Sequence, residues 1–519
     1  MAKSSLQNIN DLLESQVQKY PDKLFLIGES YKTAITYSEF NFEVNRAANI
    51  LLSVGVSKGK CVSLYLTNRV EYLTCYFACF RIGAWAGPVN ALLKPQEIAF
   101  IITNSEAVTV VTQSDLLENL RLALVNVPAI REVIVIEDSG QWSVISGQSN
   151  AAQARIESGM IKKGDDAASL QLSADDEAVI IYTSGTTGRP KGVLLTHGNL
   201  LANAEQIARW LRLTEEDRAL MIMPLFHVNA LMTTCMAALW AGGSVVLAPR
   251  FSASRHWNTI SDYGVTYFGS VATMLSMLNH TYPEGVPEGL DTSRLRFALC
   301  GSAPVPVEVM KTFESLFNCP VIEGYGLSES TCRSTFNPID ERRRVGSVGL
   351  PIGNEMKIFD EKDRELGPNE VGEIVLRGPN IMKGYYKNEA ATREAFRSGW
   401  FHTGDLGYRD EDGFFYVVDR KSDMIIRGGE NIYPREIDEV LYRHPKVKDA
   451  ATVGVKDELY GEEVKSFVVL REGESATEQE LLDFCRERLA DFKCPKTIEF
   501  LNDIPKGPTG KLLKRELAK

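Results

Sequence analysis

The feature that most constrains the fold is a recurrence of short apolar runs separated by segments with helical spacing. Runs of this length, bounded by polar or glycine-containing segments, are typical of buried strands. Alternation of such strands with helices favours α/β layers whose sheets are largely parallel. The runs occupy residues 62–66, 108–112, 133–136, 179–182, 245–248 and 296–300.

Beyond residue 348 the pattern changes twice. Residues 349–418 are richer in glycine and in alternating apolar residues, which predicts a smaller, mainly antiparallel β-unit. Residues 419–423, Asp-Arg-Lys-Ser-Asp, form a short charged linker. We therefore expect an α/β N-terminal domain over residues 1–420, which includes the β-unit, and a small α+β C-terminal domain over residues 421–519.

Composition and charge exclude several classes of function. A net charge of −11 argues against the basic surface that nucleic-acid binding requires. The nine cysteines form no Cys-x-x-Cys pair and the six histidines are dispersed, which indicates reduced thiols and a cytoplasmic location rather than disulfides or a metal cluster. We expect no signal peptide, because the N-terminus lacks an apolar core. We expect no membrane segment, because Arg81 and Pro88 interrupt the most apolar stretch, residues 72–93.

One loop carries the strongest functional signal. Residues 182–193 read Tyr-Thr-Ser-Gly-Thr-Thr-Gly-Arg-Pro-Lys-Gly-Val and follow an apolar run. Glycines let backbone amides approach an anion, while hydroxyl groups and a lysine donate to phosphate oxygens. A Walker A loop has Ser or Thr after its lysine, whereas Gly192 follows Lys191 here. We predict a phosphate-binding loop of another kind, with the residues Thr183, Ser184, Gly185, Thr186, Thr187 and Lys191.

Further motifs follow this loop in a fixed order. They are Met223-Pro-Leu-Phe-His227, Gly301-Ser-Ala-Pro304, Tyr325-Gly-Leu-Ser-Glu329, Gly372-Glu-Ile374, Trp400-Phe-His-Thr-Gly-Asp405, Asp419-Arg420, Arg427-Gly-Gly-Glu-Asn-Ile-Tyr-Pro434 and Pro508-Thr-Gly-Lys511. In this order the chain resembles the adenylate-forming superfamily of acyl-CoA synthetases, luciferases and peptide-synthetase adenylation domains. The resemblance covers nearly the whole chain and implies a large N-terminal domain followed by a mobile C-terminal domain.

The resemblance implies a reaction in two halves that uses ATP, Mg²⁺ and coenzyme A. A carboxylate attacks the α-phosphate of MgATP to give acyl-AMP and pyrophosphate, and a thiol then displaces AMP. Such transfer needs charge neutralisation and positioning rather than covalent help from the protein. Lys511, His227 and Glu329 are the implied catalytic residues, and Glu329 and Thr183 are the implied Mg²⁺ ligands.

The same resemblance implies a nucleotide site. Asp405 is expected to accept both ribose hydroxyls, Arg420 to reach the ribose or a phosphate, and Lys511 to bridge the carboxylate and the α-phosphate. Tyr325 is expected to stack on adenine, which the segment at Gly301 flanks. The remaining implied nucleotide-binding residues are Ser302, Ala303, Glu323, Gly324, Gly326 and Ser328.

For the second half-reaction the resemblance implies a rotation of the C-terminal domain. Gly428 and Gly429 are then expected to line a narrow pantetheine tunnel, and Tyr460 either stacks on the CoA adenine or packs within the domain. The hinge position carries Ser422, where similar proteins often have Asp or Lys, so the identity of the hinge stays open.

The acyl pocket is expected to contain His227, Asn229, Val271, Ala272 and Gly301. These residues are a mixture of small and polar types, which argues against a very long channel. His227 is either a structural histidine among apolar residues or, as the resemblance implies, a side chain beside the substrate carboxylate.

Three functions compete: a carboxylate–CoA ligase, a stand-alone adenylation enzyme that loads a carrier protein, and a non-catalytic nucleotide-binding relative. Amino-acid activators of this superfamily carry an Asp after Phe in the fourth motif, whereas Phe226 precedes His227 here. A buried ammonium without a carboxylate is costly, so we expect an acid without an α-amino group. The presence of Lys191, Glu329, Asp405 and Lys511 disfavours the non-catalytic reading. Fatty, aryl, short-chain and carnitine-like acids remain open, as do a monomer and a homodimer.

Overall fold

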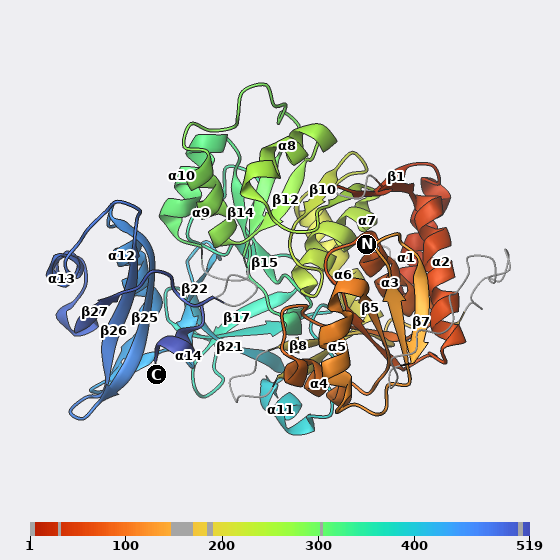
Figure 1. Cartoon of the computed structure of the whole chain (residues 1–519). Helices are drawn as coiled ribbons and strands as arrows, with labels where there is room; N and C mark the ends of the chain where they lie inside the picture. Colours follow the sequence, from red (N-terminus) through yellow and green to blue (C-terminus); the bar gives the residue numbers. More distant parts are fainter. Residues whose placement is uncertain are drawn as a thin grey trace.

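The computed structural model describes residues 6–29, 33–146, 170–183, 190–301, 305–506 and 512–518. Two large sheets build most of the N-terminal domain (Figure 1). The first has the strand order β19-β9-β8-β4-β3-β5-β6-β7. Its strands are β3 (Cys61–Tyr65), β4 (Trp85–Pro88), β5 (Ala107–Gln113), β6 (Glu132–Ile136), β7 (Trp142–Ser146), β8 (Glu177–Thr183), β9 (Lys191–Thr196) and β19 (Gly384–Tyr385).

The second large sheet has the strand order β14-β13-β12-β10-β11-β1-β2. All its neighbouring strands are parallel except the edge pair β1 and β2. Its strands are β1 (Leu24–Gly28), β2 (Thr33–Thr36), β10 (Arg218–Met221), β11 (Ser244–Leu247), β12 (Tyr267–Ser270), β13 (Phe297–Cys300) and β14 (Val321–Glu323).

Helices cover both faces of the two sheets. The helices α1 (Ile9–Lys19), α2 (Tyr37–Ser53), α3 (Val70–Arg81), α6 (His197–Trp210) and α7 (Ala237–Ala241) share one apolar core with strands of both sheets. The helices α8 (Ala253–Tyr263), α9 (Ala272–Thr281) and α10 (Val307–Phe317) pack on the outer face of the second sheet. The helices α4 (Pro95–Asn104) and α5 (Leu117–Leu124) pack on the outer face of the first. The expected α/β layers are therefore confirmed.

The sheets are less uniformly parallel than the sequence suggests. β7, β9 and β19 run antiparallel to their neighbours at the two ends of the first sheet. β8 and β9 pair antiparallel from Thr183 opposite Lys191, so the predicted phosphate-binding loop joins the two strands of a hairpin. A hairpin needs only a short connection, whereas parallel neighbours need a crossover.

The expected antiparallel β-unit is present. Its sheet consists of β17 (Glu355–Phe359), β18 (Gly372–Arg377), β20 (Phe396–Arg397), β21 (Trp400–Arg409) and β22 (Phe415–Arg420), and each pair of neighbours is antiparallel. The short helix α11 (Glu389–Ala395) precedes β20, and a two-stranded sheet joins β15 (Thr335–Phe336) to β16 (Leu350–Pro351).

The C-terminal domain is small and contains its own sheet and core (Figure 1, blue). Its strands are β23 (Ile425–Arg427), β24 (Glu430–Ile432), β25 (Val447–Asp457), β26 (Gly461–Leu470) and β27 (Thr497–Phe500), and its helices are α12 (Pro434–Tyr442), α13 (Glu478–Arg486) and α14 (Lys514–Leu517). The boundary that we predict after Arg420 falls between β22 and β23 and stays a prediction. Across the described residues, no helix is long and apolar enough to span a lipid bilayer.

Candidate active site

The carboxyl ends of three parallel strands meet at one edge of the second sheet. Ser270 of β12 pairs with Cys300 of β13, and Cys300 pairs with Glu323 of β14. Val271 and Gly301 directly follow these neighbouring strands and therefore lie close together at this edge. Crevices at the carboxyl ends of parallel strands are where α/β proteins bind ligands.

Glycines at this edge allow close packing of the backbone. A Cβ atom on Gly301 would collide with the guanidinium of Arg333 and with the carbonyl oxygen of Gly324. A Cβ atom on Gly324 would collide with the ring of Phe336, and one on Gly326 with the carbonyl oxygen of Cys332. The segment after β14 is therefore restricted to glycine at these positions by its own neighbours.

Asp405 lies at the centre of a polar cluster formed by two strands and this glycine-rich segment. Its Oδ2 accepts a 2.6 Å hydrogen bond from the hydroxyl of Tyr325, and its Oδ1 lies 3.1 Å from Nε of Arg420. Asp405 and Arg420 are directly opposite each other on β21 and β22, so strand register sets their distance. Burial and the carboxylate of Asp405 both raise the pKa of the Tyr325 hydroxyl, which remains a donor. The structure thus brings together three residues predicted to bind the nucleoside.

A second cluster connects the predicted metal ligand with the phosphate-binding loop. Oε1 of Glu329 accepts a 3.0 Å hydrogen bond from the hydroxyl of Tyr385, and Nζ of Lys191 lies 4.9 Å from the centre of the Tyr385 ring. Lys191 is opposite Thr183 in the β8–β9 hairpin. Burial raises the pKa of the Glu329 carboxyl, because a charged carboxylate is poorly solvated there. A bound cation would offset that penalty, so this carboxyl group suits Mg²⁺.

Glu323 is almost fully buried, and its Oε2 has no hydrogen-bond partner among the described residues. Desolvation raises the pKa of this carboxyl group to about 7. Ser328 begins a short 3-10 helix, Ser328–Ser330, and is only partly buried. Both residues belong to the segment that carries Tyr325 and Glu329.

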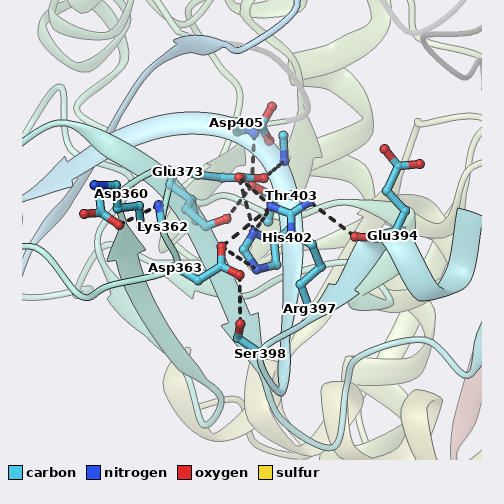
Figure 2. Close-up of polar contacts among 12 residues, drawn as sticks. Asp360, Lys362, Asp363, Glu373, Glu394, Arg397, Ser398, His402, Thr403 and Asp405 are labelled. Atoms are coloured by element: carbon cyan, nitrogen blue, oxygen red, sulfur yellow. Dashed lines mark hydrogen bonds and ion pairs between the residues drawn. The ribbon is translucent and has the colours of Figure 1, made fainter.

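A network behind Asp405 holds the Thr-Gly-Asp segment of β21, where the pairing with β18 is irregular (Figure 2). Oε1 of Glu373 on β18 accepts a 3.1 Å hydrogen bond from the backbone amide of Gly404. Oε2 of Glu373 lies 3.2 Å from Nδ1 of His402 and 3.4 Å from Nη2 of Arg397. The hydroxyl of Thr403 accepts from the amide of Asp405 and donates to a carbonyl of β18. These bonds hold the backbone of residues 403–405 and thereby set the position of the Asp405 carboxylate.

The predicted acyl-pocket residues lie around the carboxyl ends of β10 and β12. Desolvation lowers the pKa of His227 to about 4, so its imidazole is neutral at physiological pH, and its Nε2 has no partner among the described residues. Asn229 accepts a 2.8 Å hydrogen bond from Thr233 in the π-helix Ala230–Met236. Val271 is buried, and Ala272 begins α9.

The three predicted CoA-binding residues are neighbours on an exposed surface of the C-terminal domain. Gly428 and Gly429 form the turn between β23 and β24 with φ values of +59° and +92°. The amide of Gly428 donates a 2.9 Å hydrogen bond to the carbonyl of Tyr460, whose ring packs against the guanidinium of Arg427. The hinge candidate Ser422 is exposed, and its hydroxyl donates to Asp423.

Several predicted residues lie outside the described residues. They are Ser184, Gly185, Thr186, Thr187, Ser302, Ala303 and Lys511. Conversely, sequence reasoning missed Tyr385 and Arg333, and it included Glu373 only as part of the motif Gly372-Glu-Ile374, without a role in the site. Arg333 stands four positions after Glu329, so its place near the motif was visible; Tyr385 reaches the site only through strand pairing and carries no local signal.

Comparison with known proteins matches two families. Residues 13–386 match the family "AMP-binding enzyme", and residues 436–511 match "AMP-binding enzyme C-terminal domain". The chain is 36% identical to sulfoacetate–CoA ligase of Cupriavidus necator over 98% of this chain and 96% of that protein. It is 35% identical to oxalate–CoA ligase of Arabidopsis thaliana over 98% of both chains. The crystal structure of ATP-bound MatB from Rhodopseudomonas palustris superposes with a TM-score of 0.87, at 30% identity and over 98% of both chains.

Proposed function

This chain belongs to the AMP-binding enzyme family, within the adenylate-forming superfamily, and is an acid–thiol ligase; from that premise we propose the chemistry that its site performs. ATP activates a carboxylic acid without an α-amino group as acyl-AMP, with release of pyrophosphate, and the acyl group then passes to the CoA thiol. The names of its relatives support this proposal, because sulfoacetate–CoA and oxalate–CoA ligases join small acids without an amino group to CoA.

The single observation that carries the proposal is the cluster of Tyr325, Asp405 and Arg420. It combines a buried carboxylate, an aromatic ring and a guanidinium, the groups that a nucleoside monophosphate requires. A carboxylate has about four lone-pair sites, so Asp405 can accept from ribose hydroxyls while it keeps Arg420. Tyr325 presents its ring to the base, and Arg420 supplies positive charge near the phosphate.

The second cluster serves the phosphates. Lys191 adds a positive charge beside the predicted loop. Glu329 and Thr183 would hold Mg²⁺. When bound, Mg²⁺ neutralises charge on the phosphate oxygens. Tyr385 orients Glu329 through its hydroxyl group and keeps the side chain of Lys191 over its ring.

His227 is proposed to stand beside the substrate carboxylate as a neutral imidazole. Its low pKa excludes a positively charged histidine at neutral pH, so it acts as a hydrogen-bond donor and not as a counter-ion. Phe226 and His227 stand where amino-acid activators keep an acidic residue, so nothing at this position compensates an ammonium group.

The C-terminal domain is proposed to present a different face to the active site in each of the two half-reactions. Lys511 acts in adenylation, whereas Gly428, Gly429 and Tyr460 receive CoA after rotation at Ser422. A side chain at Gly428 would sit 3.2 Å from the ring of Tyr460 in a left-handed backbone conformation, so this turn favours glycine. We also propose a cytoplasmic location, which the nine free cysteines support.

The test is a pyrophosphate-release screen over carboxylic acids and amino acids, with and without CoA. Simple acids should give turnover, and proteinogenic amino acids should stay at background. An unpaired buried ammonium costs several kcal/mol, which corresponds to a factor of roughly a thousand or more. Robust exchange with an amino acid would favour the carrier-loading alternative.

A Lys511→Ala variant separates the half-reactions. It should lose acyl-AMP formation and retain thioester formation from supplied acyl-AMP, as quench assays of each half would measure. Equal loss in both half-reactions would contradict the proposal that the C-terminal domain uses a different face for each.

A further inference from the structure

Arg333 is a buried cation that the proposed chemistry does not use. The residue is only 2% exposed. Nη1 donates a 2.8 Å hydrogen bond to the carbonyl oxygen of Gly324, and the guanidinium lies 5.3 Å from the centre of the Phe336 ring. Nε is buried with no partner among the described residues. None of the described carboxylates forms an ion pair with Arg333.

The backbone of Arg333 is held from two sides. Asn203 on α6 accepts a 3.1 Å hydrogen bond from the amide of Arg333 and donates a 2.7 Å hydrogen bond to its carbonyl. Asn380 donates to the same carbonyl at 3.3 Å. All three residues are buried. The position of the arginine is therefore fixed by the protein before any ligand binds, which is how a specificity residue is pre-organised.

The guanidinium lies against the predicted acyl pocket. It packs on Gly301 so closely that any Cβ atom there would collide with Nη1. Gly301 and Val271 follow the paired residues Cys300 and Ser270, so they are neighbours at the edge of the sheet. The strand before Val271 also packs on the π-helix, since a Cβ atom on Gly269 would contact Thr233, which in turn bonds Asn229. Arg333, Gly301 and Val271 thus line one continuous edge with the pocket residues.

The cost of burying this charge calls for a counter-ion. A buried guanidinium with only neutral partners is strongly disfavoured unless an anion joins it. Among the described residues the candidate is Glu323, whose charge attracts that of Arg333 and so lowers its pKa somewhat. The two groups form no ion pair, however, and desolvation still raises the pKa of the Glu323 carboxyl group to about 7, so it is only partly ionised at neutral pH. The missing anion is therefore best supplied from outside the described protein.

We propose that Arg333 binds a second anionic group on the acyl substrate, so that the acid activated by this enzyme is a dicarboxylic acid or a sulfonated carboxylic acid. This inference rests on the proposed ligase function and specifies its substrate class. The reacting carboxylate lies toward His227 and the nucleotide, and the second anion lies at Gly301 against Arg333.

The experiment compares acids with isosteres that lack the second charge. Pyrophosphate release is measured with ATP, Mg²⁺ and CoA for oxalate, malonate, succinate, 2-succinylbenzoate and sulfoacetate, for the half-amides of the dicarboxylates, and for acetate, butyrate and benzoate. For the best dianion, kcat/KM should exceed that of its half-amide by about 100-fold or more, because the site leaves a charged donor unpaired when the second anion is missing. Comparison of kcat/KM for sulfoacetate with kcat/KM for the dicarboxylates shows whether the second anionic group is a sulfonate or a carboxylate.

Substitutions of Arg333 test whether this residue causes the preference for a dianion over its half-amide. Arg333→Met should bring the ratio of dianion to half-amide within about 10-fold of unity, mainly through KM, and Arg333→Lys should keep part of the preference. Arg218→Met is the matched control. Arg218 is a partly buried arginine that bonds Ser244 and the carbonyl of Tyr263 at the amino end of β10, so its loss should leave the ratio unchanged.

The outcomes separate this inference from the ligase function. Equal turnover of dianions and half-amides by the wild type, or turnover of monoanionic acids alone, would overturn the role of Arg333 while the ligase function stands. An unchanged ratio in folded Arg333→Met, checked by its thermal midpoint, would do the same. If Arg333→Met does not fold, the ratio in Arg333→Lys decides, since a merely structural arginine leaves that ratio at the wild-type value. No pyrophosphate release with any acid would instead refute the proposed function.

Discussion

At the scale of single residues, the site is built from charged groups that restrain one another. Asp405 uses one oxygen for Tyr325 and the other for Arg420, so each oxygen has a fixed direction before nucleotide binds. The ring of Tyr325 and its hydroxyl group therefore have separable roles, one toward the base and one toward the carboxylate.

Tyr325→Phe tests this separation. The variant keeps the ring and loses the 2.6 Å hydrogen bond to Asp405. Hydrogen bonds to charged groups contribute about 1.5–3 kcal/mol, so KM for ATP should rise by about 10- to 100-fold. Steady-state kinetics in ATP give the value, and KM for the acid should change much less. An unchanged KM for ATP would show that the hydroxyl does not position Asp405.

At the scale of elements, the antiparallel β-unit supports the nucleotide site through β18 and β21. Figure 2 shows Glu373 between His402, Arg397 and the strand that carries Asp405. The charge of Glu373 strengthens its bonds to Arg397 and to the amide of Gly404. Glu373 on β18 thus restrains Asp405 through the backbone amide of the preceding residue, Gly404.

Glu373→Gln should loosen residues 403–405 of β21 without a change in the size of the side chain. We expect KM for ATP to rise by about 3- to 10-fold, with little effect on thioester formation from supplied acyl-AMP, because a charge-assisted bond becomes a neutral one. Glu355→Gln is the control: Glu355 lies on β17 of the same sheet in an exposed ion pair with Arg377. If both variants behave alike, the network of Glu373 does not serve the nucleotide site.

At the scale of the whole molecule, the layers bury titratable groups far from solvent. Desolvation lowers the pKa of His197 and His227 to about 4 and that of His256 to about 3. His256 on α8 lies among the rings of Phe251, Trp257 and Phe268. The folded state keeps these imidazoles neutral, whereas the unfolded chain protonates them below pH 6.5.

The sign of the pH dependence follows. Each histidine contributes full stability above its unfolded pKa of about 6.5 and loses it as pH falls toward the folded value. Between pH 7 and pH 5 the loss is on the order of 2 kcal/mol per histidine. Thermal unfolding of the N-terminal domain should therefore move to lower temperature over this range. His256→Phe should reduce that decrease, and an equal decrease in the variant would contradict the linkage.

The sequence by itself determined the layers, the order of the motifs and the chemical types in the site. Apolar periodicity specifies strands and helices because burial of one face drives their formation, and the order of Lys191, Glu329, Asp405 and Arg420 points to a nucleotide site. Only the tertiary structure decided which of these groups meet. Tyr325 reaches Asp405 across eighty positions, and Tyr385 reaches Glu329 across fifty-six.

The same distinction explains what sequence reasoning missed. Arg333 appears in the chain as one more charged residue in a polar motif, and local pattern does not distinguish a solvated arginine from a buried one. Its significance comes from burial against Gly301, from two asparagines that hold its backbone, and from the lack of an ion pair with any described carboxylate. Each of these depends on segments distant in sequence that only packing brings together, because desolvation and pairing are properties of the folded environment.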